Sequence, residues 1–229
     1  MIKLASYNIR KAIGTDRLRR PERILDVINE IAPDAITLQE ADRRFRTRKS
    51  ALCPDLIASY TDMVPVRLNL RPDSIGWHGN AILVHSSASV KSHAVIELPT
   101  LEPRGAVLAD IEIRGQKLRI VGMHLDLSGF WRRKQIRAIF AAIAERPPLP
   151  TVLMGDLNEW SPHGGCFVEF AHDWHVAPTG PSFHAQRPIA KLDRIIVDRD
   201  IHIHHSGTHH SVKAKRASDH LPVWAELAF

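Results

Sequence analysis

The sequence has few cysteines and no long apolar run. Only Cys53 and Cys166 occur in its 229 residues, and neither belongs to a Cys-x-x-Cys pair. This scarcity argues against a disulfide framework and against a zinc site built on cysteines, so both residues are expected to be structural thiols. No run of about 18 apolar residues is present, so we expect no integral membrane segment.

The chain also lacks targeting features, linkers and repeats. Its opening residues MIKLASYN enter a strand-like pattern directly, without the apolar stretch and small-residue cleavage site of a secretory signal. A cytoplasmic protein is therefore expected. Because no low-complexity tract or internal repeat interrupts the chain, residues 1–229 are predicted to form one domain, which is a length that suits a single deep core.

Basic residues exceed acidic residues in an otherwise ordinary globular composition. Lysine and arginine number 31 against 25 aspartate and glutamate, which gives a net charge of +6. This excess favours anionic partners through long-range attraction, but it does not say which anion. Nucleic acid, phospholipid headgroups and small phosphate esters all remain open, and nothing in the sequence predicts a protein partner.

Apolar periodicity predicts alternating strands and helices. A helix is expected over residues 21–31, where Pro21 suits the first position and the apolar residues recur at helical spacing, and a second over residues 130–145. Gly115 is expected in the turn of a hairpin. The expected strands are residues 3–9, 35–39, 80–84, 92–98, 106–113, 117–124, 151–154, 192–198 and 221–229. Helix crossovers mixed with hairpins predict an α/β fold of two mixed sheets packed face to face, with helices outside.

Polar side chains recur at or near the ends of these apolar strands. One such residue alone has an ordinary explanation, because asparagine and aspartate are common turn formers and a lone histidine is often structural. Six strand ends of this kind in one domain favour a shared site, since α/β sheets commonly bind ligands where strand ends meet. The residues concerned are Asn8, Glu40, His124, Asp156, Asn158, Asp193, Asp219 and His220.

These residue types fit metal-assisted chemistry on a phosphate. Oxygen donors from Glu40, Asp219 and Asn8 suit magnesium or manganese, and magnesium needs only one or two protein carboxylates. Of the remaining residues, Asp156 is suited to orient or deprotonate a water molecule, and Asn158 to donate to a phosphate oxygen. The two imidazoles, His124 and His220, are suited to bind the phosphoryl group, with Asp193 fixing the orientation of one of them.

The ordered set of short motifs resembles the endonuclease/exonuclease/phosphatase superfamily, which has the deoxyribonuclease I-like fold. The resemblance covers nearly the whole chain and rests on Tyr7-Asn8-Ile9, Leu38-Gln39-Glu40, Gly79-Asn80-Ala81-Ile82-Leu83, His124-Leu125, Gly155-Asp156-Leu157-Asn158, Leu192-Asp193-Arg194-Ile195 and Ser218-Asp219-His220. It implies a four-layer α/β sandwich.

The resemblance also implies roles for individual residues. Glu40 would be the principal metal ligand, with Asn8 and Asp219 beside it. A water molecule and the phosphate would be positioned by Asp156 and Asn158. Asp193 would pair with His220, and His124 would be the second histidine that contacts phosphate. Substrate contacts are expected from Asn80, Arg104 and Arg44.

The branch within the superfamily is narrowed but not decided. His124-Leu125-Asp126 differs from the segment of abasic-site endonucleases and is more similar to deoxyribonuclease I, tyrosyl-DNA phosphodiesterase, sphingomyelinase and inositol-phosphatase relatives. Tyr7-Asn8-Ile9-Arg10-Lys11 and Pro103-Arg104-Gly105-Ala106 resemble small bacterial metal-dependent hydrolases, some of which are linked to cardiolipin synthesis. Either DNA or a lipid phosphodiester therefore fits as substrate.

Basic stretches suggest a phosphate-binding rim. Arg43, Arg44, Arg46, Arg48 and Lys49 either contact flanking phosphates or form a solvated loop. Cations at residues 132–134 are poorly placed for a helix dipole, which favours a phosphate-facing role. Residues 213–216 are expected to add a third side. The histidines of segment 202–210 alternate with isoleucine, which predicts an edge strand with outward histidines rather than a metal cluster.

Aromatic residues offer two interpretations. Trp77 with His78, and Phe130 with Trp131, either belong to substrate loops that stack on a base or touch lipid, or lie in the core, which is the default for such residues.

The function predicted from these residues is metal-dependent hydrolysis of a phosphate ester, most simply a phosphodiester, by attack of water. Three alternatives are kept: a nuclease acting on DNA, a lipid phosphodiesterase, and a catalytically silent module that binds anions. The intact charged set argues against the silent module, because a pure binder has no need of it. The number of metal ions, the preferred metal and the oligomeric state are left open.

Overall fold

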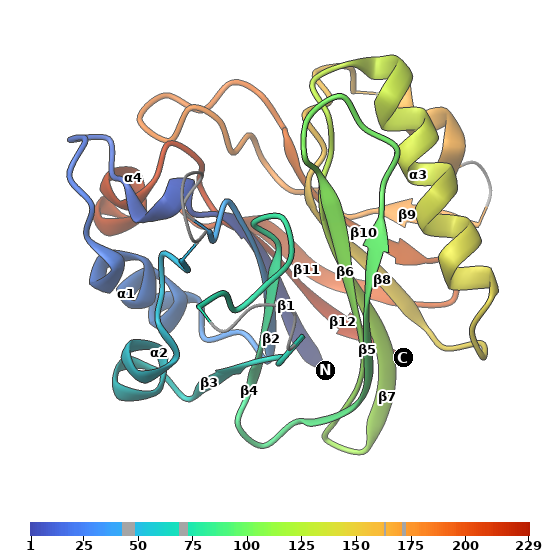
Figure 1. Ribbon diagram of the computed structural model, residues 1–229, viewed down its shortest axis with the longest axis horizontal. Coiled ribbons are helices and arrows are strands. Elements are labelled where there is room, and N and C mark those ends of the chain that lie inside the picture. The colour runs from blue at the N-terminus through green and yellow to red at the C-terminus, as the bar shows by residue number, and fades with distance from the viewer. Residues whose placement is uncertain (43–48, 69–72, 163, 171–172) are drawn as a thin grey trace.

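The structure is a computed structural model that describes residues 1–42, 49–68, 73–162, 164–170 and 173–229. It has four layers, in which two six-stranded sheets pack face to face between helices (Figure 1). The four-layer α/β sandwich expected from the sequence is therefore confirmed.

Each sheet is mixed. The first has the order β11 (His202–Thr208), β12 (Val223–Ala228), β1 (Ile2–Asn8), β2 (Ala35–Gln39), β4 (Ala81–His85) and β3 (Met63–Pro65). The second has the order β5 (Ser89–Glu97), β6 (Gly105–Ile113), β7 (Gln116–His124), β8 (Thr151–Asp156), β10 (Asp193–Asp198) and β9 (Trp174–Val176). Only β1 with β2 and β7 with β8 run parallel, so each sheet contains one parallel pair near its centre.

Helices cover the outer face of each sheet. The first sheet is covered by α1 (Pro21–Ile31), α2 (Pro54–Tyr60) and α4 (Val212–Ala217), and the second by α3 (Gly129–Ala144). Two short 3₁₀ helices, η1 (Arg10–Ala12) and η2 (Gly165–Phe170), complete the elements of the described residues. The first helix begins at Pro21, where a missing N–H costs nothing, and buries Ile24, Leu25 and Ile28.

The central core explains why the strands carry continuous apolar runs. Successive residues of a strand point to opposite faces, and both faces of each sheet are covered. In β8, Val152 and Met154 lie in the cluster between the two sheets, whereas Leu153 packs in the cluster beneath α3. Apolar side chains are therefore required at consecutive positions.

The hairpin prediction is also confirmed. Ile113 of β6 pairs with Gln116 of β7, which leaves Arg114 and Gly115 as a two-residue turn. Both turn residues have positive φ, 52° and 78°, as the tight turns that match the twist of paired strands require.

Several short elements were not predicted. They are α2, α4, β3, β9 and the two 3₁₀ helices, each of seven residues or fewer. Segments this short offer too few residues for apolar periodicity to identify them. The strand predicted for residues 151–154 extends to Asp156, so this carboxylate belongs to the strand itself.

The histidine-rich segment forms an edge strand as predicted. At the edge of the first sheet, β11 leaves His202, His204 and His205 exposed. A register shift lies between Ile203 and His205, which turns two consecutive histidines outward.

Both cysteines are free thiols, with Cys166 buried and Cys53 exposed. Burial raises the pKa of the Cys166 thiol to about 12, which makes it a poor nucleophile. The buried thiol fits the expected structural role, whereas Cys53 lies at the surface before α2. No helix within the described residues has the length and apolar character needed to cross a bilayer. The cytoplasmic location stays a prediction.

Candidate active site

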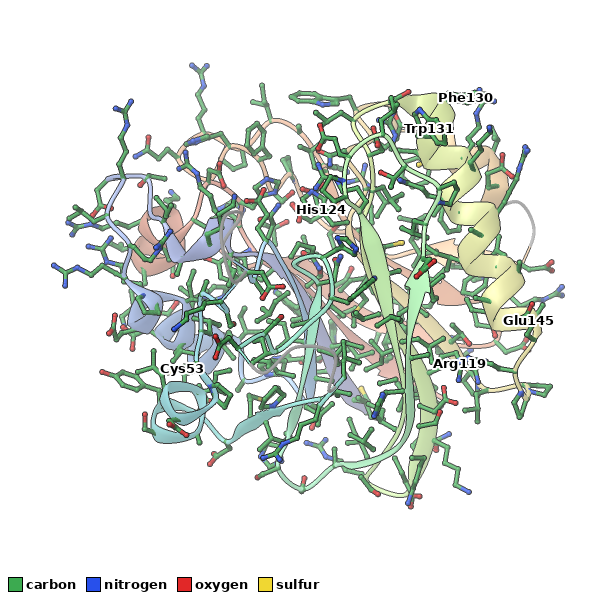
Figure 2. All side chains as sticks on the ribbon, viewed as in Figure 1. Cys53, Arg119, His124, Phe130, Trp131 and Glu145 are labelled. Carbon is green, nitrogen blue, oxygen red and sulfur yellow. The ribbon has the colours of Figure 1, made fainter. Side chains whose placement is uncertain are left out.

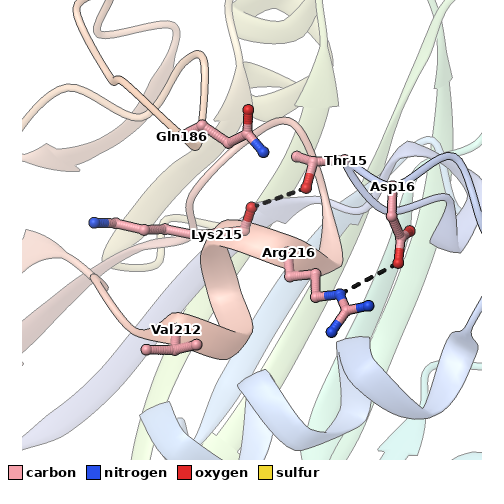
Figure 3. Close-up of a pocket in the computed structure, with 6 residues that line it drawn as sticks. All are labelled: Thr15, Asp16, Gln186, Val212, Lys215 and Arg216. Atoms are coloured by element: carbon pink, nitrogen blue, oxygen red, sulfur yellow. Dashed lines mark hydrogen bonds and ion pairs between the residues drawn. The ribbon is translucent and has the colours of Figure 1, made fainter.

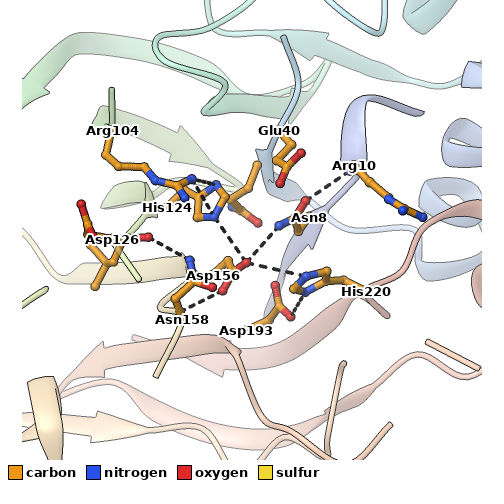
Figure 4. A network of polar contacts seen from close by, with 12 residues as sticks. Asn8, Arg10, Glu40, Arg104, His124, Asp126, Asp156, Asn158, Asp193 and His220 are labelled. Carbon is orange, nitrogen blue, oxygen red and sulfur yellow. Dashed lines mark hydrogen bonds and ion pairs between the residues drawn. The ribbon is translucent and has the colours of Figure 1, made fainter. Parts of the chain in front are cut away.

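The polar strand ends meet where the two sheets face each other (Figure 4). Within the second sheet, Asp156 of β8 lies directly between His124 of β7 and Asp193 of β10 in the strand register. The first sheet contributes Asn8 from the end of β1, across the sandwich. Strand pairing thus aligns three residues far apart in sequence, packing of the two sheets brings Asn8 to them, and His220 arrives from the segment before β12.

Asp156 is the centre of this group and is 1% exposed. Its Oδ2 accepts a hydrogen bond from Asn8 Nδ2 at 2.9 Å, and its Oδ1 accepts one from the backbone N–H of Asn158 at 2.9 Å. The same Oδ2 lies 3.5 Å from Nε2 of His124 and 3.8 Å from Nε2 of His220. The carboxylate is therefore fixed in orientation between two imidazole rings.

A second aspartate holds His220. Asp193 is fully buried, and its Oδ2 lies 2.8 Å from Nδ1 of His220 and accepts a hydrogen bond from the Ser182 hydroxyl at 2.5 Å. Burial opposes a charge on the imidazole, but the Asp193 and Asp156 carboxylates outweigh it and raise the pKa of His220 to about 10. His220 is consequently a cation at neutral pH, with Nε2 directed toward Asp156.

His124, the other histidine, has a lowered pKa and is neutral. Burial, with the neighbouring Arg104 cation, lowers the pKa of His124 to about 3, although Asp156 works in the other direction. One guanidinium nitrogen of Arg104 lies 3.0 Å from both ring nitrogens of His124. The site therefore places a neutral imidazole and a cationic imidazole on either side of the Asp156 carboxylate.

Backbone geometry at the end of β8 explains the Gly155-Asp156-Leu157-Asn158 motif. Gly155 has a φ of 158°, and a Cβ there would lie 1.8 Å from the carbonyl oxygen of Met123 on β7. Asn158 has a φ of 49°, a conformation that asparagine tolerates, and its Nδ2 donates to the carbonyl of Leu125 at 2.9 Å. The glycine thus permits the close strand approach that brings Asp156 beside His124.

The predicted metal ligands carry cationic partners. The Glu40 carboxylate pairs with Nζ of Lys11, and the Asp219 carboxylate lies 3.2 Å from Nε of Arg10. Asn8 Oδ1 accepts a hydrogen bond from the Arg10 backbone N–H at 3.2 Å. Neither Arg10 nor Lys11 was predicted as a site residue, although both follow the Asn8 strand end closely in the sequence.

These two cations lie on an unusual backbone. Arg10, Lys11 and Ala12 have φ values of 44°, 57° and 58°, and Glu40 has a φ of 51°. Non-glycine residues in the left-handed region store strain, and such strain concentrates at functional sites. This strained backbone conformation places the Lys11 ammonium beside the Glu40 carboxylate.

Two sets of oxygen-rich donors differ in their fit to a metal. Among the described residues, Asp156, Asp193 and His220 have ligand atoms within 4.8 Å of one another, but all three are buried and already joined to each other or to neighbours. In the predicted set Asn8 is also buried, at 2% exposure, but the two carboxylate side chains are more accessible, at 29% for Glu40 and 20% for Asp219. Glu40, Asp219 and Asn8 also present only oxygen donors, the kind that a hard divalent cation prefers.

The predicted substrate contacts fall in three places. Arg104 lies against His124 and also pairs with Glu102 at 3.1 Å. Asn80 is buried and donates to the carbonyl of Gly105 at 2.8 Å, while its Oδ1 has no hydrogen-bond partner in the described part of the chain. Arg44 and its neighbours from 43 to 48 lie outside the described residues.

One residue of the predicted basic rim points inward, which corrects the phosphate-facing interpretation. Arg132 is 7% exposed, and its guanidinium donates to Glu159 Oε2 at 2.9 Å and to the Leu127 carbonyl at 2.7 Å. Its charge therefore holds the loop after β7 to the loop after β8, although Arg133 and Lys134 beside it are exposed.

The third predicted side of the rim lines an open pocket of about 450 Å³ beside α4 (Figure 3). Thr15 Oγ1 donates to the Lys215 carbonyl at 3.3 Å, and Arg216 Nε lies 3.2 Å from Asp16. Lys213 lies within 4 Å of carboxylates on α1, at 3.7 Å from Asp26 and 3.9 Å from Glu30. Two of the three cations therefore neutralise nearby acids.

An aromatic pair near His220 was not predicted. The Phe183 ring lies 4.9 Å from the His220 ring and 6.3 Å from the Trp160 ring, between ring centroids. Trp160 follows the Gly155-Asp156-Leu157-Asn158 motif by two residues, so its place near the site could be expected from the sequence. The earlier aromatic candidates divide: Phe130 is 57% exposed, whereas Trp77, His78 and Trp131 are half-buried.

The four-layer sandwich and its buried Asp–His cluster define a class of proteins that assemble a site from strand ends of two facing sheets. The chain belongs to the Endonuclease/Exonuclease/phosphatase family, whose sequence profile matches residues 5–220. A sequence comparison with curated proteins found no match.

Solved structures share this fold. The mannosyl-6-phosphatase Bt3783 of Bacteroides thetaiotaomicron is 18% identical, with a TM-score of 0.75 and complete coverage of both chains. The human Nocturnin catalytic domain with bound sulfate is 20% identical, with a TM-score of 0.75, covering 100% of this chain and 94% of that one. TDP2 of D. rerio complexed with single-strand DNA product is 16% identical, with a TM-score of 0.73, covering 100% and 99%.

Proposed function

We propose that this protein is a magnesium-dependent hydrolase of phosphate esters, most simply of a phosphodiester, that uses water as nucleophile. The observation that carries the proposal is the Asp156 carboxylate, held by Asn8 and Asn158 between a neutral His124 and a cationic His220. Membership of a family that includes phosphatases and nucleases supports the same chemistry.

Asp156 is placed to orient a water molecule and to accept its proton. Its Oδ1 accepts the Asn158 N–H, and its Oδ2 lies 3.5 Å from Nε2 of His124 and 3.8 Å from Nε2 of His220. Asn8 Nδ2 holds that oxygen in place. A general base must be fixed within hydrogen-bond reach of its proton, and these two contacts supply the fixing.

His220 and Asn158 are placed to bind the phosphoryl group. The imidazolium of His220 is held by Asp193, so its charge is oriented before the substrate arrives and costs no reorganisation. The Asn158 amide uses one hydrogen on the Leu125 carbonyl, which leaves the second for a phosphate oxygen. A neutral His124 beside Arg104 offers a further uncharged contact.

Glu40, Asp219 and Asn8 would hold the magnesium ion. When bound, the ion supplies positive charge that neutralises the phosphate and its leaving oxygen. Lys11 at Glu40 shows that this carboxylate already attracts a cation. Manganese shares the preference for these oxygen donors and is the alternative metal.

The proposal is tested by a panel of esters: supercoiled DNA, a chromogenic phosphodiester, a chromogenic phosphomonoester and a phospholipid. We expect hydrolysis of at least one member that requires magnesium and stops with chelator. Glu40→Gln, which keeps the size but removes the charge of the predicted ligand, should lower the rate by about 100-fold.

Glu145→Gln is the matched control, because Glu145 is exposed at the end of α3. It should retain wild-type activity. A folded wild-type protein that hydrolyses none of the four esters with magnesium would contradict the proposal, as would full activity in Glu40→Gln.

A further inference from the structure

Five large apolar side chains, four on loops and Phe130 in the first turn of α3, are exposed at the site end of the sandwich. Such residues scattered singly are normal on protein surfaces, but a group of them beside one site marks a surface that contacts something apolar. This apolar rim consists of Leu101 (74% exposed), Leu127 (65%), Phe130 (57%), Trp160 (63%) and Ile189 (74%).

Hydrogen bonds hold the first part of the rim together. Thr100, next to Leu101, lies with its hydroxyl 3.4 Å from Asp126 Oδ2, and so ties the loop between β5 and β6 to the loop after β7. Leu127 follows Asp126 directly, and its carbonyl accepts the hydrogen bond from Arg132. The two leucines therefore project from loops that are fixed to each other.

The second part of the rim is joined to the first through buried groups. Glu159, which precedes Trp160, binds Arg132 and so connects the loop after β8 to the start of α3. Trp160 contacts the Phe183 ring, and the Phe183 carbonyl accepts a hydrogen bond from the Ile189 N–H at 2.8 Å. The rim is thus a set of neighbouring loops rather than separate protrusions.

The rim adjoins the candidate active site. Leu127 lies three residues after His124, and Phe183 connects the rim to His220 through a ring contact. Phe130 is labelled at the same end of the molecule as His124 (Figure 2), and the loops after β5 and β7 lie at that end as well (Figure 1). An apolar partner that binds the rim would therefore lie next to the candidate active site.

Cations accompany the apolar side chains. Nζ of Lys134 lies 4.4 Å from the centre of the Phe130 ring, Arg133 is exposed beside it on α3, and Arg187 is exposed on the loop that carries Ile189. Of the nearby acids, Asp126 and Glu159 are buried, at 3% and 4% exposure, and Glu102, whose side chain is 38% exposed, is paired with Arg104 at 3.1 Å. The accessible charge close to the rim is therefore mainly positive.

We propose that the apolar rim docks this protein on the surface of a bilayer that contains anionic phospholipid. Leucine, phenylalanine and tryptophan beside lysine and arginine are the composition of surfaces that bury apolar side chains among headgroups while cations bind anionic lipid. A single nucleic-acid strand is the weaker fit, because three of the five residues are aliphatic and have no ring on which a base can stack. The inference goes beyond the proposed hydrolysis and would bring ester substrates carried by lipids to the site.

Vesicle sedimentation tests the rim. Wild-type protein should bind vesicles of equimolar phosphatidylcholine and phosphatidylglycerol and bind pure phosphatidylcholine more weakly, because the cations lose their partners. The triple variant Leu101→Ser, Leu127→Ser and Phe130→Ser should bind the anionic vesicles at least about tenfold more weakly, since the apolar area that enters the headgroup layer is lost. Its thermal midpoint should remain that of wild type, because all three side chains are exposed.

The matched control is the triple variant Tyr60→Ser, Val64→Ser and Val168→Ser, which removes exposed apolar side chains on α2, β3 and η2. It should bind vesicles as wild type does. Equal loss in both triple variants, or no vesicle binding by wild type, would overturn the inference. So would loss of single-stranded DNA binding in the rim variant while vesicle binding persists, because the rim would then bind nucleic acid.

Vesicle binding and ester hydrolysis can be tested independently, so failure of one proposal is distinguishable from failure of the other. Asp156→Asn should bind anionic vesicles like wild type, because Asp156 is buried and lies outside the rim. Binding without hydrolysis of any ester would leave the rim standing and remove the catalytic proposal. Hydrolysis of a chromogenic ester without vesicle binding would support the catalytic proposal and contradict the docking role of the rim.

Discussion

Asp156→Asn should lower kcat for ester hydrolysis by about 10²- to 10⁴-fold while the protein remains folded. The substitution keeps the size of the side chain, and its amide oxygen can still accept from one of its two present donors, the Asn8 amide or the Asn158 N–H. It removes the negative charge that accepts a proton, and it also removes one of the carboxylates that raise the pKa of His220. Both losses should slow the chemical step and leave the stability of the fold unchanged.

The measurement is steady-state hydrolysis of whichever ester in the panel is cleaved, with a thermal melt of each protein. Asp55→Asn is the control, because Asp55 is exposed in the first turn of α2, far in sequence from the site. It should change neither quantity. If a well-folded Asp156→Asn protein turned over at the wild-type rate, the role assigned to Asp156 would be wrong.

Arg119→Met should reduce the free energy of unfolding by about 3–5 kcal/mol. Arg119 is 1% exposed, and its guanidinium binds Asp110 on the adjacent strand through two hydrogen bonds, at 2.7 and 3.0 Å. A third donor contact reaches the carbonyl of Pro147 at 3.1 Å. Removing the arginine leaves a largely buried carboxylate whose remaining side-chain partner, within the described part of the chain, is the Ser92 hydroxyl.

A second arginine–carboxylate pair, with the same geometry but at the surface, shows how much of the effect is due to burial. Arg137 and Glu169 make the same two-point contact, with both hydrogen bonds at 2.8 Å, but the arginine side chain is 67% exposed. Arg137→Met should therefore cost far less, because solvent screens the pair and rehydrates the remaining acid. Urea titration of both variants measures the difference.

A second variant distinguishes lost pairing from lost packing. Arg119→Met combined with Asp110→Leu should recover part of the stability, since no buried charge then remains unpaired. Equal losses in Arg119→Met and Arg137→Met would show that the buried position adds nothing. No recovery in the double variant would assign the loss to packing of the long arginine side chain.

Much of the framework was predictable because its signals are local. Pro21 and the apolar spacing after it identify α1 to its exact ends, and the turn at Gly115 identifies the hairpin of β6 and β7. Strands buried on both faces appear in the sequence as short apolar runs, so their polar ends at Asn8, His124 and Asp156 stand out. For this reason the residues gathered at the site could be named before their positions were known.

Other features have no local signal. The turn of Arg132 into the interior depends on Glu159, which lies 27 residues away and reaches it only across two loops. Short elements such as α2 and β3 are stable through packing on their neighbours, so their own residues show no clear period. The approach of Lys11 to Glu40 likewise depends on a left-handed backbone that propensities do not predict.

The sequence by itself determined the layered α/β framework and the identity of the polar strand-end residues, because periodicity and strand ends are properties of neighbouring residues. Only the tertiary structure decided the chemical state of those residues. His124 and His220 are the same residue type at similar burial, yet one is neutral beside Arg104 and the other is charged beside Asp193. Their charges are set by partners that folding brings from elsewhere in the chain, and electrostatic energy depends on those distances in space.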